Sequence, residues 1–118
     1  MAATVRTGDL VKTTEPCHAP GTIPLAPRPE GTVLINGKAA ARFGDLTMPY
    51  AEGFPPVCVT NAGKPITGPC SPTVLVEGKP LSLFGDVVDG KNPVIEYSPN
   101  VFADTAEDEI EEEEVAEE

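Results

Sequence analysis

Short apolar runs separated by turn residues make up most of the chain. The clearest run is Val33-Leu34-Ile35; the pair Asn36-Gly37 follows it, and an extended stretch from Ala39 to Phe43 comes next. This pattern predicts a β-hairpin, because Asn and Gly tolerate the positive φ angles of a tight two-residue turn. No long window has the apolar period of a helix, so we expect a body made of strands and loops.

The predicted hairpin also has a register. A two-residue turn places Leu34 opposite Ala39 and Val33 opposite Ala40, so that large side chains face small ones. Such pairing suits strands that converge on an axis, where space is short. Ordinary core packing accepts the same pairing, and the sequence favours neither explanation.

The hairpin segment is written twice. Thr32–Asp45 reads TVLINGKAAARFGD, and Thr73–Asp86 reads TVLVEGKPLSLFGD. Eight of the fourteen aligned positions are identical, whereas chance would give about one. The second copy keeps the turn glycine in Glu77-Gly78 and therefore predicts a second hairpin.

A third copy of the segment is split between the two ends of the chain. Residues 98–103 resemble residues 71–76, and residues 2–9 match the second half of the repeat at Ala3, Arg6, Gly8 and Asp9. We therefore expect the last strand of the body to pair with the first, and the termini to lie close together. Three such units, each too small to bury its own apolar face, predict a compact body with approximate three-fold symmetry.

Length and composition limit the body to one small domain. The chain has 118 residues, with 14 Pro, 11 Gly and no Trp, and a core of this size is marginal without a staple. The prolines stiffen the connections and limit long paired strands. The predicted fold class is mainly β: residues 1–103 form a small pseudo-three-fold domain of β-hairpins and Pro/Gly-rich loops.

Negative charge is concentrated in residues 104–118. This segment holds ten of the 19 Asp and Glu residues, so the formal net charge of −11 describes the tail and leaves the body nearly neutral. A dense acidic run repels itself and buries little, which predicts a disordered tail. A docking tag for a basic partner, such as an effector, cargo protein or chaperone, is the alternative. The body has no basic stripe with interleaved aromatic residues, so we expect no binding to nucleic acid.

The N-terminal segment does not have the pattern of a signal peptide. Residues 1–12 have no apolar stretch of the kind found in a signal peptide, and no window approaches the ~20 apolar residues of a membrane span. We expect a protein that is made in the cytoplasm and that, if it leaves, does not use a conventional signal.

The remaining unusual residues are three cysteines and one histidine, Cys17, His18, Cys58 and Cys70. Thiolates and imidazole are typical tetrahedral zinc ligands, and all four residues lie in proline-rich connections that can meet at one end of the body. The chain lacks the Cys-x-x-Cys pair of a zinc finger. Ordinary buried thiols beside a surface histidine are the alternative, and the odd cysteine count argues against a disulfide framework.

The stretch Asn36–Asp45, NGKAAARFGD, resembles the signature of the PAAR family, in which Pro-Ala-Ala-Arg stands between an Asn-Gly-Lys turn and Gly-Asp. Gly-Asp recurs at Gly8-Asp9 and Gly85-Asp86, and the resemblance covers nearly all of residues 2–103. Family members are small pseudo-three-fold cones that cap the trimeric β-helical spike of contractile injection machines: type VI secretion systems, phage tails and extracellular particles. Ala39 replaces the motif proline and the second copy keeps only Pro80, so the chain looks like a PAAR-like branch.

The resemblance implies a mechanical cap with a metal-stabilised vertex. One cap would close each spike trimer, leave the cytoplasm when the machine fires, and touch the target membrane only on injection. The candidate spike contacts are the apolar residues Val33, Ile35, Val74 and Val76. The family binds a metal near the vertex through His and Cys, which implies one structural zinc ion, with iron less favoured, at Cys17, His18, Cys58 and Cys70.

We expect no enzymatic activity. Asp9, Asp45 and Asp86 recur once per unit, but Gly-Asp at the end of a strand is typical of a turn whose carboxylate accepts local backbone hydrogen bonds. The chain has no Ser/His pair with an orienting acid and no phosphate-cradling glycine loop. The alternatives to a cap are a free-standing zinc-stabilised binding module with an acidic recruiting tail and, third, a secreted disulfide-stapled domain.

Overall fold

Thirteen short strands joined by loops make up the computed structural model, which describes residues 2–18 and 21–103. No helix forms in these residues, and the predicted mainly β fold is confirmed. The predicted disorder of residues 104–118 concerns a segment outside this range. In chain order the strands are β1 (Ala2–Ala3), β2 (Leu10–Lys12), β3 (Thr22–Pro24), β4 (Leu34–Ile35), β5 (Lys38–Ala39), β6 (Ala51–Phe54), β7 (Val57–Thr60), β8 (Ile66–Gly68), β9 (Leu75–Val76), β10 (Lys79–Pro80), β11 (Val87–Val88), β12 (Asn92–Pro93) and β13 (Phe102–Ala103).

Three two-stranded hairpins correspond to the three copies of the repeat. β4 pairs with β5 and β9 with β10, and the turns Asn36-Gly37 and Glu77-Gly78 have positive φ at both residues. Leu34 lies opposite Ala39, as the turn predicts. β13 pairs with β1 in the corresponding register. The predictions that the chain ends share a hairpin and lie close together are therefore confirmed for residues 2 and 103.

Backbone hydrogen bonds join the three hairpins into a closed ring. The amide of Ala41 donates to the carbonyl of Val5 (2.9 Å), that of Val5 to Ser82 (3.1 Å), and that of Ser82 back to Ala41 (2.9 Å). Val5, Ala41 and Ser82 occupy the same position of the repeat in the three copies, and all three are fully buried. A second cycle of 2.8 Å bonds links Thr7 to Ala39, Phe43 to Pro80 and Phe84 to Ala3. Each hairpin is thus bonded to both of the others.

Two clusters of buried side chains form the core. One lies between the hairpins and contains Ile35, Ala40, Val76, Leu81, Leu83 and Ala103. The other is built around the β2–β3 pair and the β8–β11–β12 sheet, and it contains Val5, Val11, Ile23, Leu25, Ala41, Tyr50, Ile66, Cys70, Val88 and Val94. Burial of each Val, Leu or Ile contributes about 1.5–3 kcal/mol, and the small side chains in the ring let the three backbones approach closely.

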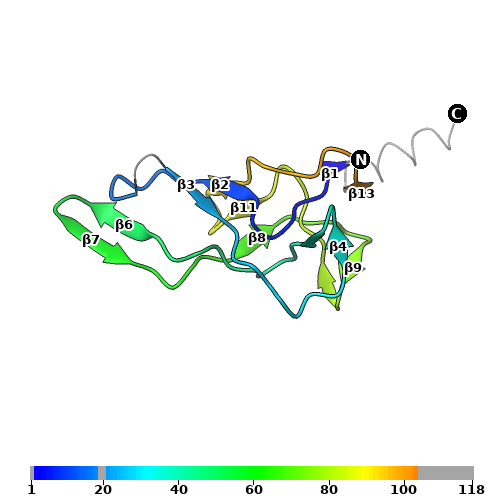
Figure 1. Cartoon of the computed structure of the whole chain (residues 1–118). Coiled ribbons are helices and arrows are strands. Elements are labelled where there is room, and N and C mark those ends of the chain that lie inside the picture. The colour runs from blue at the N-terminus through cyan, green and yellow to red at the C-terminus, as the bar shows by residue number, and fades with distance from the viewer. Residues whose placement is uncertain (1, 19–20, 104–118) are drawn as a thin grey trace, which may run out of the picture.

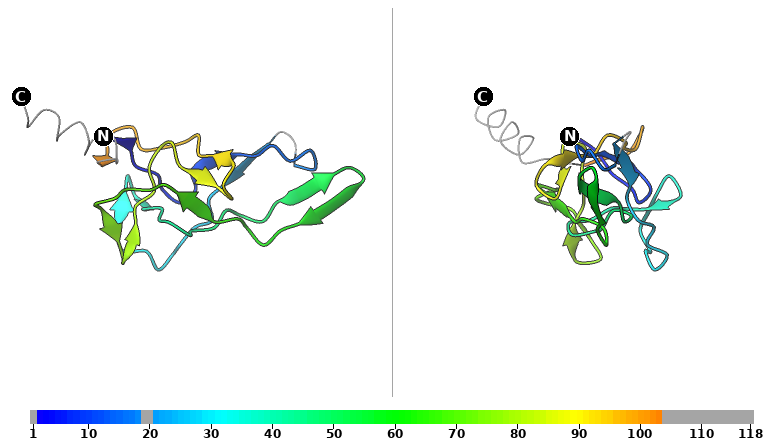
Figure 2. Two further views of the ribbon diagram at one scale, coloured as in Figure 1. Left: turned by 180° about the vertical axis from the view of Figure 1, so that it is seen from behind. Right: turned by 90° about the vertical axis from the view of Figure 1, so that its left-hand side faces the viewer.

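The molecule is elongated, and its two ends differ. Figure 1 shows β1, β4, β9 and β13 at one end, β2, β3, β8 and β11 in the middle, and the β6–β7 pair projecting at the other end; Figure 2 agrees from behind. We call the first end the hairpin end (β1, β4, β5, β9, β10 and β13) and the β6–β7 pair the distal hairpin. The sequence did not predict the distal hairpin, because Pro55-Pro56 reads as a loop; these two residues form its turn.

Candidate partner-binding end and the cysteine sites

The hairpin end exposes one large apolar side chain per hairpin at matching positions of the repeat. Leu34 is 60% exposed, Leu75 64% and Phe102 52%. Single exposed leucines are ordinary on protein surfaces. The same exposure at one repeat position in all three hairpins is a pattern, and it makes the hairpin end the first candidate for a contact with a partner.

The four residues predicted to contact the spike fall into two groups. Ile35 and Val76 are only 7% and 4% exposed and belong to the core between the hairpins. Val33 is 42% exposed, and Val74 is half-buried against the same core. Burial leaves little of Ile35 and Val76 for another chain, whereas their neighbours in β4 and β9 face outward.

Charged pairs fasten the first hairpin to the second. The largely buried guanidinium of Arg28 lies 3.2 Å from Asp45 and 3.0 Å from Glu77, and it donates to the carbonyl of Ala40. Arg42 reaches the same two carboxylates at 3.3 and 3.6 Å. Glu77 belongs to the turn between β9 and β10, so this network crosses between hairpins. Loss of one partner would leave a buried charge uncompensated.

The aspartates of the repeated Gly-Asp pairs accept local backbone hydrogen bonds. The amide three positions earlier donates to each carboxylate at 2.8 or 2.9 Å: Arg6 to Asp9, Arg42 to Asp45 and Leu83 to Asp86. The predicted turn chemistry is confirmed. Asp9 is fully buried and also accepts from the Arg6 guanidinium at 2.8 Å. This hydrogen bond raises the pKa of Arg6 and outweighs the opposing effect of burial.

The Gly-Asp unit at Gly85-Asp86 differs from the other two, because Leu83 stands where they have arginine. Buried Asp86 is held instead by the Ser82 hydroxyl at 2.8 Å and by the amide of Cys70 at 3.0 Å. Burial, and then the negative charge of Asp86, raise the pKa of the Cys70 thiol well above its usual range. Cys70 is therefore a neutral buried thiol at neutral pH, unlike the thiolates that bind metals or attack substrates.

Cys17 and Cys58 form a disulfide. The bridge joins residues that are 41 apart in sequence and ties the segment before β3 to the distal hairpin. Two hydrogen bonds reinforce the connection: the amide of Cys17 donates to the carbonyl of Gly53 (3.3 Å), and the amide of Gly53 donates to Glu15 (3.1 Å). The expectation against a disulfide is corrected, since the odd count leaves Cys70 free without preventing one bridge.

The four predicted zinc ligands do not form one cluster. Cys17 and Cys58 share the disulfide, Nε2 of His18 lies 2.6 Å from the carbonyl of Thr22, and Cys70 is buried in the core. Within residues 2–18 and 21–103, no group of three or more His, Cys, Asp or Glu side chains is arranged to hold a metal ion. This arrangement does not fit a zinc centre, and binding of zinc is a prediction from the sequence alone. The covalent cross-link that the structure contains is the Cys17–Cys58 disulfide.

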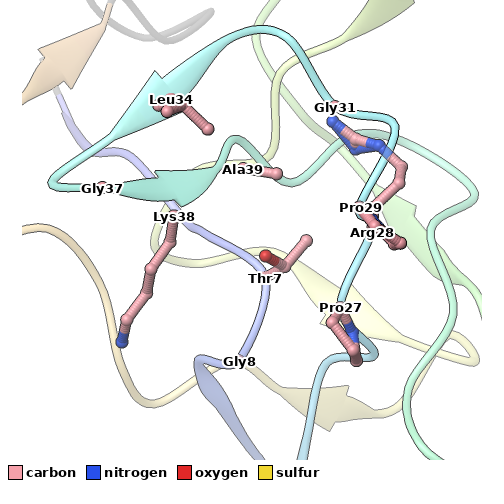
Figure 3. Close-up of a pocket in the computed structure, with 10 residues that line it drawn as sticks. All are labelled: Thr7, Gly8, Pro27, Arg28, Pro29, Gly31, Leu34, Gly37, Lys38 and Ala39. Carbon is pink, nitrogen blue, oxygen red and sulfur yellow. The ribbon is translucent and has the colours of Figure 1, made fainter.

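A shallow pocket of about 390 Å³ opens beside the β4–β5 hairpin (Figure 3). Its lining is mainly apolar and includes Leu34, Pro27 and Pro29, with Thr7 on one side and Lys38 at the rim. Leu34 points towards it. An apolar side chain of a partner that entered this pocket would contact Leu34 and the two prolines.

No protein-family model matches the chain. The resemblance to the PAAR family therefore rests on the repeated residues and their Gly-Asp pairs. No helix in the part of the chain that the structure describes is long and apolar enough to cross a membrane.

Proposed function

We propose that the chain is a structural cap that closes the end of a trimeric β-helical spike in a contractile injection machine. The ring of backbone hydrogen bonds through Val5, Ala41 and Ser82 is the observation that carries this proposal. A chain that presents one hairpin three times around an axis can meet three identical subunits through similar contacts. A single copy of this chain then suffices for each spike trimer.

Pseudo-three-fold symmetry of the body is part of the proposal. A linear array of repeats leaves its first and last units unjoined, but here the hairpin made from the two chain ends bonds to both of the others. Bridges between the hairpins follow the same cyclic order: Thr4 to Leu83, Arg6 to Ala40 and Arg42 to Leu81. Each bridge joins the residue before the ring residue of one copy to the residue after the ring residue of another copy, which supports three equivalent units around an axis.

The hairpin end faces the spike in this proposal. Leu34, Leu75 and Phe102 are the exposed side chains of this end, so they take the role predicted for the buried Ile35 and Val76. Each of the three would contribute about 1–2 kcal/mol on burial against a spike subunit. Each of these hairpins is a two-stranded sheet, and a strand at the edge of a sheet can pair with a strand of another chain.

The distal hairpin points away from the spike and leads the assembly through the target envelope. The role is mechanical and needs no catalysis. Disulfides persist in oxidising surroundings, so the Cys17–Cys58 bridge suits a protein that works outside the cytoplasm. Docking of an effector or cargo protein to residues 104–118 and binding of zinc stay predictions from the sequence.

Native mass spectrometry of the chain mixed with trimeric β-helical spikes from type VI, phage and extracellular machines tests the proposal. We expect a complex of one chain with one trimer. The variant Leu34→Glu/Leu75→Glu/Phe102→Glu should not bind, whereas Phe54→Glu/Val57→Glu/Val59→Glu, three matching changes at exposed apolar residues of the other end, should bind normally.

Deletion of residues 104–118 should leave spike binding intact, whereas a module recruited through the acidic tail would lose its partner. Binding to no spike in the panel, three chains per trimer, or a homotrimer of the chain alone would contradict the cap.

A further inference from the structure

The distal hairpin is the most exposed part of the described chain. Residues 53–60 are all exposed, and Phe54, Val57 and Val59 expose 76%, 71% and 68% of their surface. Figure 1 shows this hairpin projecting beyond the rest of the molecule. The proposed spike contact does not account for this apolar surface, because it uses the opposite end.

The projecting segment has almost no polar side-chain chemistry. Residues 53–59 read GFPPVCV, without a charge or a side-chain amide or hydroxyl, and the sulfur of Cys58 is in the disulfide. A specific protein interface combines an apolar centre with a polar rim that hydrogen-bonds to the partner. These residues supply the apolar centre alone, and the charged groups nearest to it, Glu52 and Glu15, are already paired with lysines of this chain.

The backbone near the turn presents few free donors. Phe54 lies opposite Val57 in the antiparallel pair, Pro55-Pro56 between them has no N–H, and the amide of Gly53 donates to Glu15. Unpaired backbone donors make an extended segment costly to place in hydrocarbon. Two prolines in the turn lower that cost where the hairpin reaches farthest.

Charged pairs stand directly behind the apolar segment. Glu52 lies 3.2 Å from Lys64, and Glu15 lies 3.3 Å from Lys91. Pro55 at the turn lies three positions after Glu52, a length of about 10 Å in a strand. This length matches the roughly 5–10 Å that interfacial elements enter a bilayer and falls well short of the ~30 Å hydrocarbon core.

We propose that the distal hairpin inserts its Phe-Pro-Pro-Val turn into the interfacial layer of a lipid bilayer and stops at the charged pairs. An isolated two-stranded hairpin is marginal in water, and the Cys17–Cys58 bridge holds this one in place. The inference rests on the proposed orientation, because it names what the free end of the cap meets. Vesicles test it on the chain alone, so its failure and the failure of spike binding are separate results.

Tryptophan probes give the sharpest test, because the chain contains no Trp. Phe54→Trp marks the distal hairpin, and Leu34→Trp marks the hairpin end as the matched control. With vesicles of zwitterionic phosphatidylcholine, which do not repel a chain of net charge −11, we expect the emission of the Phe54→Trp probe to shift to the blue and brominated lipids to quench it, with neither change at the control position. Adding Val57→Glu to the Phe54→Trp chain should weaken partitioning at least about tenfold, whereas adding Leu34→Glu should leave it unchanged.

Dye trapped in the vesicles should stay inside, because a penetration of about 10 Å does not span the bilayer. An unshifted Phe54→Trp probe at millimolar lipid, or equal shifts at both ends, overturns the proposal. A probe that responds to spike trimers and not to vesicles assigns the hairpin to a protein partner, and release of the dye contradicts the shallow placement.

Discussion

Removal of the Cys17–Cys58 disulfide is expected to destabilise the whole domain by about 4 kcal/mol. A bridge between residues 41 apart removes loop-closure entropy from the unfolded chain, worth about 4 kcal/mol at 25 °C. Packing in the folded state does little to offset the loss of the bridge, because the distal hairpin that it holds buries few side chains. Small domains are stable by only about 5–15 kcal/mol, so this is a large share of the total.

Urea unfolding measures the effect in three samples: the oxidised chain, the chain with reductant, and the variant Cys17→Ser/Cys58→Ser. The last two should agree with each other and lie about 4 kcal/mol below the first. In thermal unfolding the same loss lowers Tm by roughly 15–30 °C for a domain of this size. Reductant added to the double variant is the control and should change nothing, because Cys70 is not bridged.

A difference below about 1 kcal/mol between the oxidised chain and the double variant would refute the reasoning. Alkylation of the denatured chain without reductant gives an independent check. The bridge predicts that one thiol, that of Cys70, reacts. Three reactive thiols would show that the two cysteines are not joined in the folded protein.

Three further predictions concern the buried charges and the predicted metal. Asp9→Asn removes the fully buried member of the Arg6 ion pair and should cost about 3 kcal/mol in urea unfolding, whereas Lys91→Ala, at an exposed pair, should have no measurable effect; equal losses would contradict this assignment. The raised pKa keeps the Cys70 thiol protonated in the folded state, whereas in the unfolded state the thiol ionises above its usual pKa of 9.0. The free energy of unfolding should therefore fall above pH 9.0 by up to about 1.4 kcal/mol per pH unit. Cys70→Ala should lack this extra slope, and identical pH profiles would remove the thiol as its cause. Metal analysis should find no stoichiometric zinc in the oxidised chain, because Cys17 and Cys58 are bridged. The zinc site predicted from the sequence would bind one zinc ion per chain in the presence of reductant. One zinc ion per chain without reductant would argue against the bridge.

The repeat made the architecture of the hairpin end predictable. Asn36-Gly37 and Glu77-Gly78 determine the turns, and the turns determine the register of the strands that flank them. Alignment of the split copy led to the pairing of β1 with β13. The sequence did not show which face of each hairpin points into the core, because a two-residue strand is too short to show an alternation of buried and exposed residues. Leu34 and Ile35 are both aliphatic, and only contacts between hairpins leave one exposed and the other buried.

The opposite end was less predictable for physical reasons. Pro55-Pro56 argues against long strands in general, but a turn needs no N–H from its central residues, so two prolines fit between paired strands. The pairing of Cys17 with Cys58 depends on where the distal hairpin brings the two residues together. The number of cysteines carries no information about that position.

β13 and β1 pair across the two ends of the chain as β4 pairs with β5 across a turn. The first and last residues of the body therefore lie where the other hairpins have their turn, in the middle of a structural unit and not at its edge. An Asn-Gly linker from Ala103 to Ala2, combined with a new opening between Asn36 and Gly37, would give a circular permutant in which β5 is the first strand and β4 the last. The order in which the chain visits the hairpins is then incidental, and the bonds that close the ring define the fold.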